Sequence, residues 1–393
     1  MERMITVFTP IYNRAYCIEK LYDSLKKQTR KNFEWLIIDD GSTDNVEEIV
    51  ETWIGSEKEF PIRFYKVKNG GKMRAVNKGV QLSDMPAFFI VDSDDYLTEN
   101  AMELLGKWFL QIKDDDDFAG VSGLRKITTI DSEYDFKYID CTNLERRKYN
   151  LTLDMAECYK TEILRRYPAI EIEGENYLSP SYLWNSIAKD GYKLRYYNEY
   201  IYVTTYLPDG LSVNNLSVKA RNPKGWAKII NLDIECKNDS EYSEMQYYFY
   251  YLQMHELIPK EEIANNLEIN VELLNEIISN KPEIIRKINA FFIDRNIKRV
   301  ALYGLGGEAK RFLQLLNDLN IQIEYGIDRS HRDLLPQCYS LSQELPPVDA
   351  VLITNRAGIK AIREDIKLCM NCHIISLQED ILEKSLNYYF SDI

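Results

Sequence analysis

Three carboxylates stand close together at Asp92, Asp94 and Asp95, directly after the apolar run 88–91. Four consecutive apolar residues are typical of a buried strand, so the carboxylates would emerge where that strand ends. Carboxylates this close repel one another unless a cation neutralises them, and their hard oxygen ligands suit Mg²⁺ or Mn²⁺ rather than Zn²⁺. A divalent cation at the end of a parallel strand is where an α/β protein would hold a diphosphate. The alternative is an acidic turn that caps the next helix, with Asp95 or Thr98 as the N-cap.

Polar and aromatic side chains also follow two other predicted strands in the first half of the chain. After residues 4–9, Pro10 would stop the strand, and the Tyr12 ring could stack on a nucleotide base. After residues 33–38, the carboxylate of Asp40 could accept the imide N–H of uracil, and the glycine that follows it permits a tight turn. The alternative for this second cluster is a turn that only caps the next helix.

Residues 69–79 form another cluster, in which a Gly-Gly pair precedes a predicted helix that carries Lys72, Arg74 and Asn77. The flexible pair, the helix N-terminus and the basic side chains together suit a phosphate group. The alternative is a plain loop followed by a solvated helix face.

Apolar runs that alternate with amphipathic stretches join these clusters. The pattern predicts, in order, strand, helix, strand, helix, strand, helix and strand over residues 4–9, 15–27, 33–38, 45–54, 62–67, 72–81 and 88–91. This order predicts an α/β fold with a mostly parallel sheet and helices on both faces. Because crossovers between parallel strands are right-handed, the strand ends meet at one edge. We therefore expect the clusters to share one crevice.

In this order and spacing, the four clusters resemble the family 2 glycosyltransferases of the GT-A fold, over residues 1–215. The resemblance implies that Asp40 recognises the base, most often uracil. It implies that Asp92 lies near the ribose or the sugar, that Asp94 holds Mn²⁺ or Mg²⁺, and that Asp95 faces the donor sugar or the acceptor. The other residues that it assigns to the nucleotide or the donor sugar are Thr9, Pro10, Tyr12, Arg14, Lys72, Arg74, Asn77 and Ser93.

The resemblance also implies an inverting reaction, in which a carboxylate base takes the proton of the acceptor hydroxyl. Family members commonly carry this base just before a helix in the second half of the domain, but here Pro180 stands where they have a Glu. We expect Glu175 to be the base, with Glu173 as the alternative and an inactive domain as a further one. The residues expected near the acceptor, or in a loop over the site, are Trp184, Asp209 and Ser212.

The rest of the chain predicts two further parts. Residues 216–295 have an almost wholly helical pattern, and residues 296–393 alternate strands with helices like a small Rossmann-like domain. Within that domain, Gly304, Gly306 and Ala309 have the spacing of a dinucleotide fingerprint between a strand and a helix, and Asp328 ends the next strand. The alternatives for this domain are a working nucleotide site and an interaction or regulatory module.

Composition excludes several classes of function. The 62 acidic residues outnumber the 49 basic ones, and the net charge of −13 disfavours a nucleic-acid binder. We expect neither a membrane span nor a signal peptide, since no apolar stretch is long enough and the N-terminus runs into a strand. The seven scattered Cys residues, among which only Cys369 and Cys372 form a CxxC pair, indicate reduced, structural thiols and a cytoplasmic protein.

Together with these features, the resemblance implies an inverting, metal-dependent glycosyltransferase. It would move a sugar from a nucleotide-sugar, expected to be a UDP-sugar, to a glycan, lipid-linked glycan or polyol-phosphate acceptor in cell-surface polysaccharide biosynthesis, such as that of a bacterial capsule. The alternatives are an NAD(P)-linked enzyme acting through residues 296–393 and a non-catalytic nucleotide-binding scaffold. The sequence leaves open peripheral contact with the inner face of the membrane, and a homo-oligomer built through the Tyr-rich residues 241–252.

Overall fold

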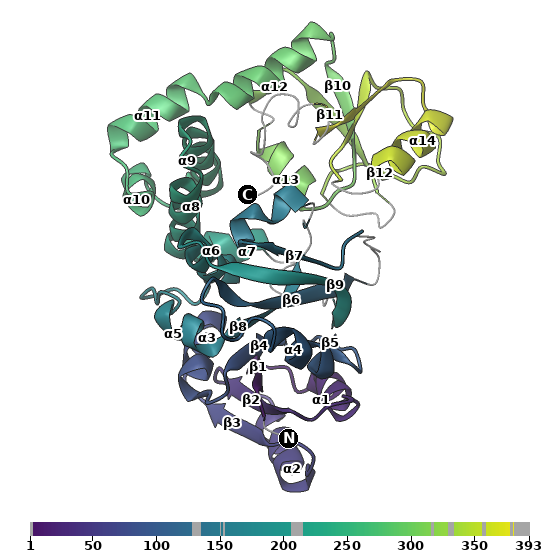
Figure 1. Ribbon diagram of the computed structural model, residues 1–393. Coiled ribbons are helices and arrows are strands. Elements are labelled where there is room, and N and C mark those ends of the chain that lie inside the picture. The colour runs from purple at the N-terminus through teal and green to yellow at the C-terminus, as the bar shows by residue number, and fades with distance from the viewer. Residues whose placement is uncertain are drawn as a thin grey trace. The chain divides into compact units, whose positions relative to one another are not determined.

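The computed structural model describes residues 3–127, 135–149, 151, 154–205, 215–315, 318–328, 334–355, 359–377 and 380. The chain divides into two compact units, Met1–Cys236 and Lys237–Ile393, and each has its own β-sheet (Figure 1). The division into three domains, with boundaries at residues 215 and 295, stays a prediction.

One mixed sheet forms the centre of the first unit. Its strand order over the described residues is β3-β2-β1-β4-β8-β6-β9-β5, with β7 paired to β9. The strands β3, β2, β1 and β4 are parallel, whereas β8 runs antiparallel to both β4 and β6. The bounds are β1 Ile5–Ile11, β2 Phe33–Asp39, β3 Ile62–Lys66, β4 Ala87–Ile90, β5 Tyr96–Leu97, β6 Phe118–Ile127, β7 Tyr138–Cys141, β8 Met155–Lys160 and β9 Lys193–Thr204.

Helices cover both faces of this sheet, which confirms the predicted α/β class. The helices α1, α2 and α4 pack on one face, where Leu21, Val50 and Leu105 join the main apolar core. Helix α3 packs on the opposite face and against α5. The bounds are α1 Ile18–Lys26, α2 Val46–Ser56, α3 Lys72–Leu82, α4 Ala101–Phe109, η1 Asn143–Tyr149, α5 Thr161–Arg166, α6 Pro180–Lys189, α7 Asn215–Arg221 and α8 Pro223–Lys237.

Strand β1 continues to Ile11, so the expectation that Pro10 stops it is wrong. The Phe8 carbonyl accepts a hydrogen bond from Val91 N–H at 2.8 Å, so the backbone groups of Phe8, and those of Pro10 two residues on, face the β4 side. Strand β4 pairs with β1 only as far as Phe8, whereas β2 pairs with it to Ile11. Pro10 therefore lacks an N–H only where no strand needs one.

A glycine in α3 lets this helix lie close to β1. A Cβ atom built at Gly79 would lie 2.2 Å from the Phe8 ring, well inside contact distance. The missing side chain therefore sets how near the helix comes to the strand. Since α3 begins at Lys72, the same packing helps to place the loop that precedes the helix.

The second unit combines helices with a parallel sheet of its own. Its strand order is β12-β11-β10-β13-β14, and every pairing in this sheet is parallel. Strand β10 has β11 on one side and β13 on the other, as in a doubly wound sheet, which confirms the predicted Rossmann-like fold. The bounds are α9 Ser240–Met254, α10 Lys260–Asn266, α11 Val271–Asn280, α12 Glu283–Asp294, β10 Arg299–Tyr303, α13 Gly307–Gln314, β11 Gln322–Ile327, β12 Cys338–Tyr339, β13 Ala350–Ile353, α14 Ile359–Cys369 and β14 His373–Ser376.

Among the helices of the described ranges, none has both the length and the apolar character that a membrane crossing requires.

Candidate active site

The carboxylate of Asp40 fastens the loop before α3 to the end of β2. Its Oδ1 accepts a hydrogen bond from Gly70 N–H at 2.8 Å, and its Oδ2 accepts one from Gly71 N–H at 2.7 Å. Burial raises the pKa of Asp40 above its ordinary value, although these two N–H groups act to lower it. Gly71 has a φ of +95°, a conformation that favours glycine. The turn predicted to read the base and the loop predicted to hold phosphate are thus one connected structure.

The loops after β1 and β2 are also fixed to each other. Asn13 N–H donates to Ser42 Oγ at 2.9 Å, and Asn13 Oδ1 accepts from Thr43 N–H at 2.8 Å. Asp44 Oδ2 accepts from Ala15 N–H at 2.8 Å. Sequence reasoning did not assign Asn13 to the site, although an Asn that can adopt a left-handed φ (52°) just after a strand was the available signal.

Tyr12 and Arg14 reach the carboxyl edge of the sheet from the loop after β1. The Tyr12 side chain is 47% exposed, so its ring is free to stack on a base. The Arg14 guanidinium acts to lower the pKa of Asp94, which places its charge near the acidic turn after β4. Pro10 is half-buried within β1.

Two other predicted donor residues turn into the protein instead. Thr9 is fully buried, and its hydroxyl accepts a hydrogen bond from Trp35 Nε1 at 3.0 Å. Ser93 is also buried, and its backbone carbonyl accepts from Cys17 Sγ at 3.7 Å. Any contact of these residues with a nucleotide would therefore have to come from the backbone.

Lys72 and Asp92 join the phosphate loop to the acidic turn. Lys72 Nζ lies 2.5 Å from Asp92 Oδ1. Burial acts to raise the pKa of Asp92, but the Lys72 ammonium and the Arg125 guanidinium outweigh it, and the pKa lies below its ordinary value. Arg125, on β6, was missed by sequence reasoning. Its guanidinium lies 4.2 Å from the centre of the Tyr202 ring, and its Nε donates to Met155 O at 2.6 Å.

Asp95 lies beneath the turn, facing the protein interior. It is 3% exposed, and its oxygens accept hydrogen bonds from the Tyr202 hydroxyl and from Thr205 N–H, both at 2.7 Å. The same Tyr202 hydroxyl accepts from Asp92 N–H at 3.0 Å. Burial and the negative charge of Asp92 raise the pKa of Asp95 to about 7. This geometry gives Asp95 a role in holding the turn, not the sugar-facing position that the resemblance implies. Neither Asp95 nor Thr98 caps α4, whose N-cap is Asn100.

Arg74 and Asn77 hold residues 169–172 instead of pointing to the Lys72–Asp92 pair. Arg74 donates to the carbonyls of Gly70 and Ile172 at 3.1 and 3.0 Å, and its Nε lies 3.3 Å from Glu171 Oε2. The Asn77 amide makes two hydrogen bonds with the backbone of Ala169, at 2.8 and 2.9 Å. Both side chains therefore position a neighbouring segment.

The two candidates for the base differ sharply in their surroundings. The Glu175 carboxylate accepts hydrogen bonds from Lys224 N–H at 2.8 Å and Gly225 N–H at 2.7 Å, in the first turn of α8. Glu173 is exposed, and its side chain makes no hydrogen bond or ion pair within the described part of the chain. The Glu175 carboxylate is therefore engaged in holding the start of α8, whereas the Glu173 carboxylate is exposed.

Helix α6 starts where the sequence departs from the family pattern. Pro180 is its first residue, and the Ser179 side chain caps it. Trp184 stacks on Tyr159 with ring centres 4.3 Å apart, so its ring already has a protein partner. Asp209 and Ser212 lie outside the described residues.

A comparison with protein families matches the part of the chain that contains the donor and metal residues described above. The family model described as Glycosyl transferase family 2 matches residues 6–165. Residues 6–165 belong to glycosyltransferase family 2. The predicted resemblance is confirmed for this range, which contains every predicted donor and metal residue.

Two curated relatives match part of the chain. The chain is 33% identical over 116 residues to Glycosyltransferase GlyG of Streptococcus pneumoniae, a match that covers 30% of this chain and 37% of GlyG. It is 36% identical over 110 residues to Chondroitin synthase of Pasteurella multocida, which covers 28% of this chain and 11% of that enzyme. The match therefore spans well under two thirds of either relative.

Solved structures share the general architecture at low similarity. The fragment 1–349 of TarS from S. aureus has a TM-score of 0.48 and 16% identity, covering 74% of this chain and 87% of the fragment. A mannosyltransferase from Pyrobaculum calidifontis, in complex with GDP-Man and Mn²⁺, has a TM-score of 0.43 and 16% identity, covering 71% of this chain and 76% of its own. Neither similarity is high enough to carry an argument about ligands.

The acidic turn of the family 2 domain suits one divalent cation held largely by its substrate. The described residues contain no group of three or more His, Cys, Asp or Glu side chains arranged to bind a metal. Asp94 is half-buried, and burial together with the charge of Asp92 raises its pKa above the ordinary value. Such a carboxylate gains from a nearby cation, and Mg²⁺ and similar ions commonly use one or two carboxylates plus substrate phosphates. The residues present therefore fit a metal–diphosphate complex at Asp94.

In the second unit, the glycine fingerprint lies where the sequence places it, between β10 and α13. Gly304 has a φ of +85°, and a Cβ atom there would lie 1.7 Å from Asn355 Oδ1. Asp328 Oδ2 accepts a hydrogen bond from Leu305 N–H at 2.8 Å, so this carboxylate braces the glycine loop. Cys369 and Cys372 are free thiols.

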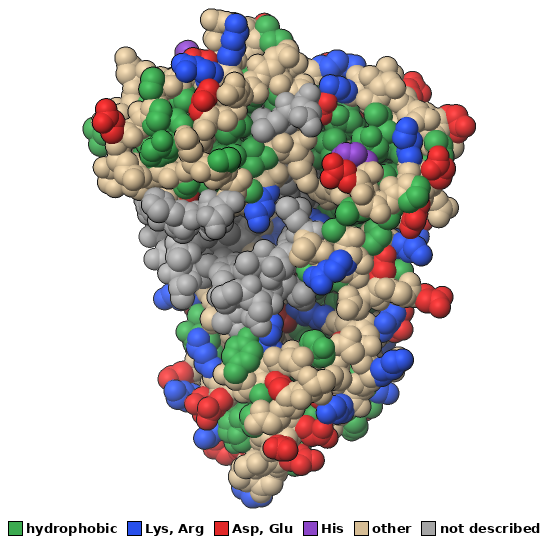
Figure 2. Space-filling model, turned by 180° about the vertical axis from the view of Figure 1, so that it is seen from behind, with side chains coloured by type: hydrophobic (Ala, Val, Ile, Leu, Met, Phe, Trp, Pro, Cys, Tyr) green, Lys and Arg blue, Asp and Glu red, His purple; other side chains and the backbone are tan. Residues whose placement is uncertain are grey.

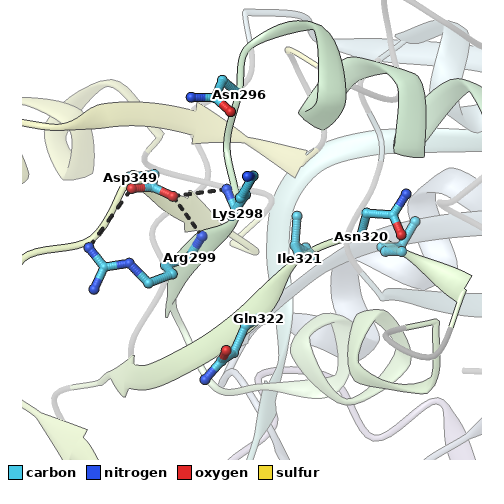
Figure 3. A pocket seen from close by; sticks show the side chains of 8 residues that line it. Asn296, Lys298, Arg299, Asn320, Ile321, Gln322 and Asp349 are labelled. Carbon is cyan, nitrogen blue, oxygen red and sulfur yellow. Dashed lines mark hydrogen bonds and ion pairs between the residues drawn. The ribbon is translucent and has the colours of Figure 1, made fainter.

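An open hollow of about 650 Å³ lies at the other, amino edge of that sheet (Figure 3). Asp349 accepts hydrogen bonds there from the N–H groups of Arg299 and Lys298, at 2.8 and 2.9 Å, and the Arg299 guanidinium lies 4.0 Å from it. The Arg299 and Lys298 N–H groups hold the pKa of Asp349 below its ordinary value. These bonds join the starts of β10 and β13, so Asp349 has a structural function.

Proposed function

We propose that this protein is an inverting glycosyltransferase that moves a sugar from a nucleotide-sugar, with UDP as the expected nucleotide, to a hydroxyl of an acceptor. One observation carries the proposal. At the carboxyl edge of the parallel strands, Asp40 holds the Gly70–Gly71 loop, and the next residue, Lys72, is paired with Asp92 of the acidic turn. A nucleotide diphosphate needs a base-reading group, a phosphate loop and an acidic turn together at such an edge.

The roles of the donor residues follow from their positions. The exposed Tyr12 ring would stack on the base, and the Asp40 turn would read its edge. The Lys72 ammonium would exchange part of its contact with Asp92 for a phosphate oxygen. We assign Arg74 and Asn77 to positioning, because their polar groups are engaged with residues 169–172.

Asp94 would hold Mn²⁺ or Mg²⁺ against the diphosphate. The cation, when bound, stabilises the negative charge that develops on the leaving diphosphate. Asp92 would lie near the ribose or the sugar. Asp95 would hold the turn that carries Asp92 and Asp94, through its hydrogen bond with Tyr202.

The acceptor hydroxyl needs a base within hydrogen-bond reach. We assign this role to Glu173, whose carboxylate is exposed, and place Glu175 second because it holds the start of α8. Inversion at the anomeric carbon follows from direct attack by the deprotonated hydroxyl, since no covalent sugar intermediate is then required.

We further propose an acceptor in cell-surface polysaccharide biosynthesis, such as a glycan, lipid-linked glycan or polyol phosphate. The relatives named chondroitin synthase and hyaluronan synthase support a polysaccharide product. In Figure 2, Lys and Arg side chains are interspersed with Asp and Glu over the exposed face of the first unit, which supports the expectation of no nucleic-acid partner. A cytoplasmic location, peripheral membrane contact and a homo-oligomer are parts of the same proposal.

A ligand panel tests the proposal on the full chain. UDP with Mn²⁺ should raise the unfolding temperature, whereas NAD⁺ should not, and Asp94→Ala should abolish the Mn²⁺-dependent part of the shift. A hydrolysis screen of UDP-, GDP- and CDP-linked sugars with Mn²⁺ would then identify the donor. Stabilisation by NAD⁺ without any response to UDP and Mn²⁺ would favour the alternative enzyme of the second unit.

A further inference from the structure

Asn222 binds the backbone of residues 176 and 177 from the junction between α7 and α8. It is 3% exposed, and its Oδ1 accepts hydrogen bonds from Asn176 N–H at 2.9 Å and Tyr177 N–H at 3.1 Å. Its Nδ2 donates to Val218 O at 2.7 Å. Each polar atom of the buried amide thus has a partner, and each bond ties the junction either to itself or to residues 176–177.

Glu175 makes the reverse connection. Its carboxylate accepts the N–H groups of Lys224 and Gly225, in the first turn of the helix that begins at Pro223. N–H groups in a first turn have no partner within the helix, and a negative charge is favourable at that end. Asn222 and Glu175 therefore join the two segments in both directions.

Two glycines enclose this turn. A Cβ atom at Gly225 would lie 2.6 Å from Tyr177 O, and one at Gly71 would lie 1.8 Å from Asn176 O. Both distances are far below a normal contact, so residues 176–177 touch backbone on either side. We call Glu175, Asn222 and Gly225 the α8 clamp.

The turn that the clamp holds packs against Gly71 in the proposed donor site. Gly71 N–H is bound to Asp40, and the next residue, Lys72, is paired with Asp92. Tyr177 lies in the same neighbourhood, because it lines one small cavity together with Gly70 and Asn176. Residues 176–177 therefore form the outer wall of the phosphate loop.

We propose that the α8 clamp is a positioning element for the donor diphosphate: it presses residues 176–177 against Gly71 and thereby holds the Gly70–Lys72 loop in its binding shape. Asn222 is then a positioning residue of the transferase, although it lies outside the part of the chain that matches the family model. The diphosphate ligand rests on the proposed function, whereas the ordering of the loop does not.

The first experiment measures UDP affinity with Mn²⁺ by calorimetry in three variants. Asn222→Ala removes the bonds to residues 176–177, and Gly225→Ala wedges a methyl group against Tyr177 O. We expect each to weaken UDP binding about tenfold, which for Asn222→Ala is the effect of losing one or two hydrogen bonds. Gly55→Ala is the matched control, because a Cβ at that helical glycine meets nothing within 4 Å. It should bind UDP like the natural protein.

A second control separates positioning from general loss of stability. Thr161→Val removes a part-buried hydrogen bond to Met85 O, 2.6 Å long. This bond lies beside the start of β4, at the opposite edge of the sheet from the donor site. It should lower the unfolding temperature without changing UDP affinity. If Asn222→Ala and Gly225→Ala bind UDP like the natural protein, or if Thr161→Val weakens binding as much as they do, the clamp has no positioning role.

Hydrogen exchange tests the clamp without any ligand. The Gly70 and Gly71 amides are bound to Asp40, so they should exchange slowly in the natural protein and several-fold faster in Asn222→Ala. Unchanged exchange would overturn the inference even if UDP binds. If the natural protein does not bind UDP with Mn²⁺ but Asn222→Ala still speeds exchange at Gly70 and Gly71, the proposed function is refuted and the clamp is not.

Discussion

Replacing Tyr202 with Phe would remove a single oxygen atom from beneath the acidic turn. That oxygen donates to Asp95 Oδ2 at 2.7 Å and accepts from Asp92 N–H at 3.0 Å, and the side chain is fully buried. A neutral hydrogen bond contributes about 1 kcal/mol and one to a charged group about 1.5–3 kcal/mol. Because burial raises the pKa of Asp95 to about 7, this group is only partly charged at neutral pH. We therefore expect Tyr202→Phe to lower the free energy of unfolding by about 2–3 kcal/mol.

Tryptophan fluorescence during urea unfolding is a suitable assay for this loss. All five Trp residues, at positions 35, 53, 108, 184 and 226, belong to the unit Met1–Cys236. The signal thus reports on the unit that contains the turn, even if the second unit unfolds separately. UDP affinity with Mn²⁺, measured on the same samples, should fall as well, since Asp92 loses its backbone support.

Tyr149→Phe is the matched control for this prediction. Tyr149 belongs to the same unit and is 43% exposed, so removing its hydroxyl should leave the unfolding midpoint unchanged. A free-energy change below about 0.5 kcal/mol for Tyr202→Phe, the range of a surface substitution, would refute the proposed role of this hydroxyl.

Four further predictions concern the site and the second unit. Tyr12→Ala should weaken UDP binding about tenfold by loss of stacking, whereas Tyr12→Phe should bind normally in calorimetry. With Asp94→Ala, Mn²⁺ should no longer increase UDP affinity in the same assay, and an unchanged Mn²⁺ effect would place the cation elsewhere. Glu173→Gln should abolish sugar transfer at an unchanged unfolding temperature, whereas Glu175→Gln should lower that temperature by breaking one bond to α8. The reverse pattern would restore Glu175 as the base. Asp349→Asn should destabilise the second unit at pH 7. Backbone donors keep the pKa of Asp349 low, so its stabilisation is present above the ordinary value of 3.8 and disappears as the pH falls through the lower folded value. Circular dichroism melts at pH 7 and pH 3 should therefore show a difference that shrinks at pH 3.

The sequence predicted the parts of the site that follow from local pattern. Apolar runs locate the parallel strands, and the edge at which they end brings Asp40, Lys72 and Asp92 together. These residues are found because their type and their place after a strand are both visible in a short window. The same reasoning found the glycine loop of the second unit at Gly304.

Residues that reach the site from distant elements were missed for a physical reason. Tyr202 is one Tyr among 28, and its partner Asp95 lies 107 positions earlier. Asp95 directly precedes β5, which pairs antiparallel with the strand β9 that carries Tyr202. Asn222 and Arg125 likewise act through sheet order and helix packing, which no local periodicity encodes.

Helix geometry explains why Arg74 and Asn77 serve a neighbouring segment. Successive helical residues turn by about 100°, so positions two and five after Lys72 point about 200° and 140° away from it. Read as a linear motif, the sequence suggested that Lys72, Arg74 and Asn77 all lie at the phosphate. The helix separates Lys72, which faces Asp92, from the other two, which face residues 169–172.

The close approach of Gly79 to Phe8 couples the packing of α3 to the position of Lys72 at the start of the same helix. Gly79 lies seven positions after Lys72, which corresponds to about 10 Å along the helix axis. A methyl group at Gly79 could not be accommodated by a small rotamer change, since the atom it would meet belongs to an aromatic ring packed on a strand. We expect α3 to shift away from β1 instead, and the Lys72 ammonium to move with the helix. We therefore expect a larger side chain at Gly79 to lower the donor affinity proposed for this domain, from a position outside the proposed site.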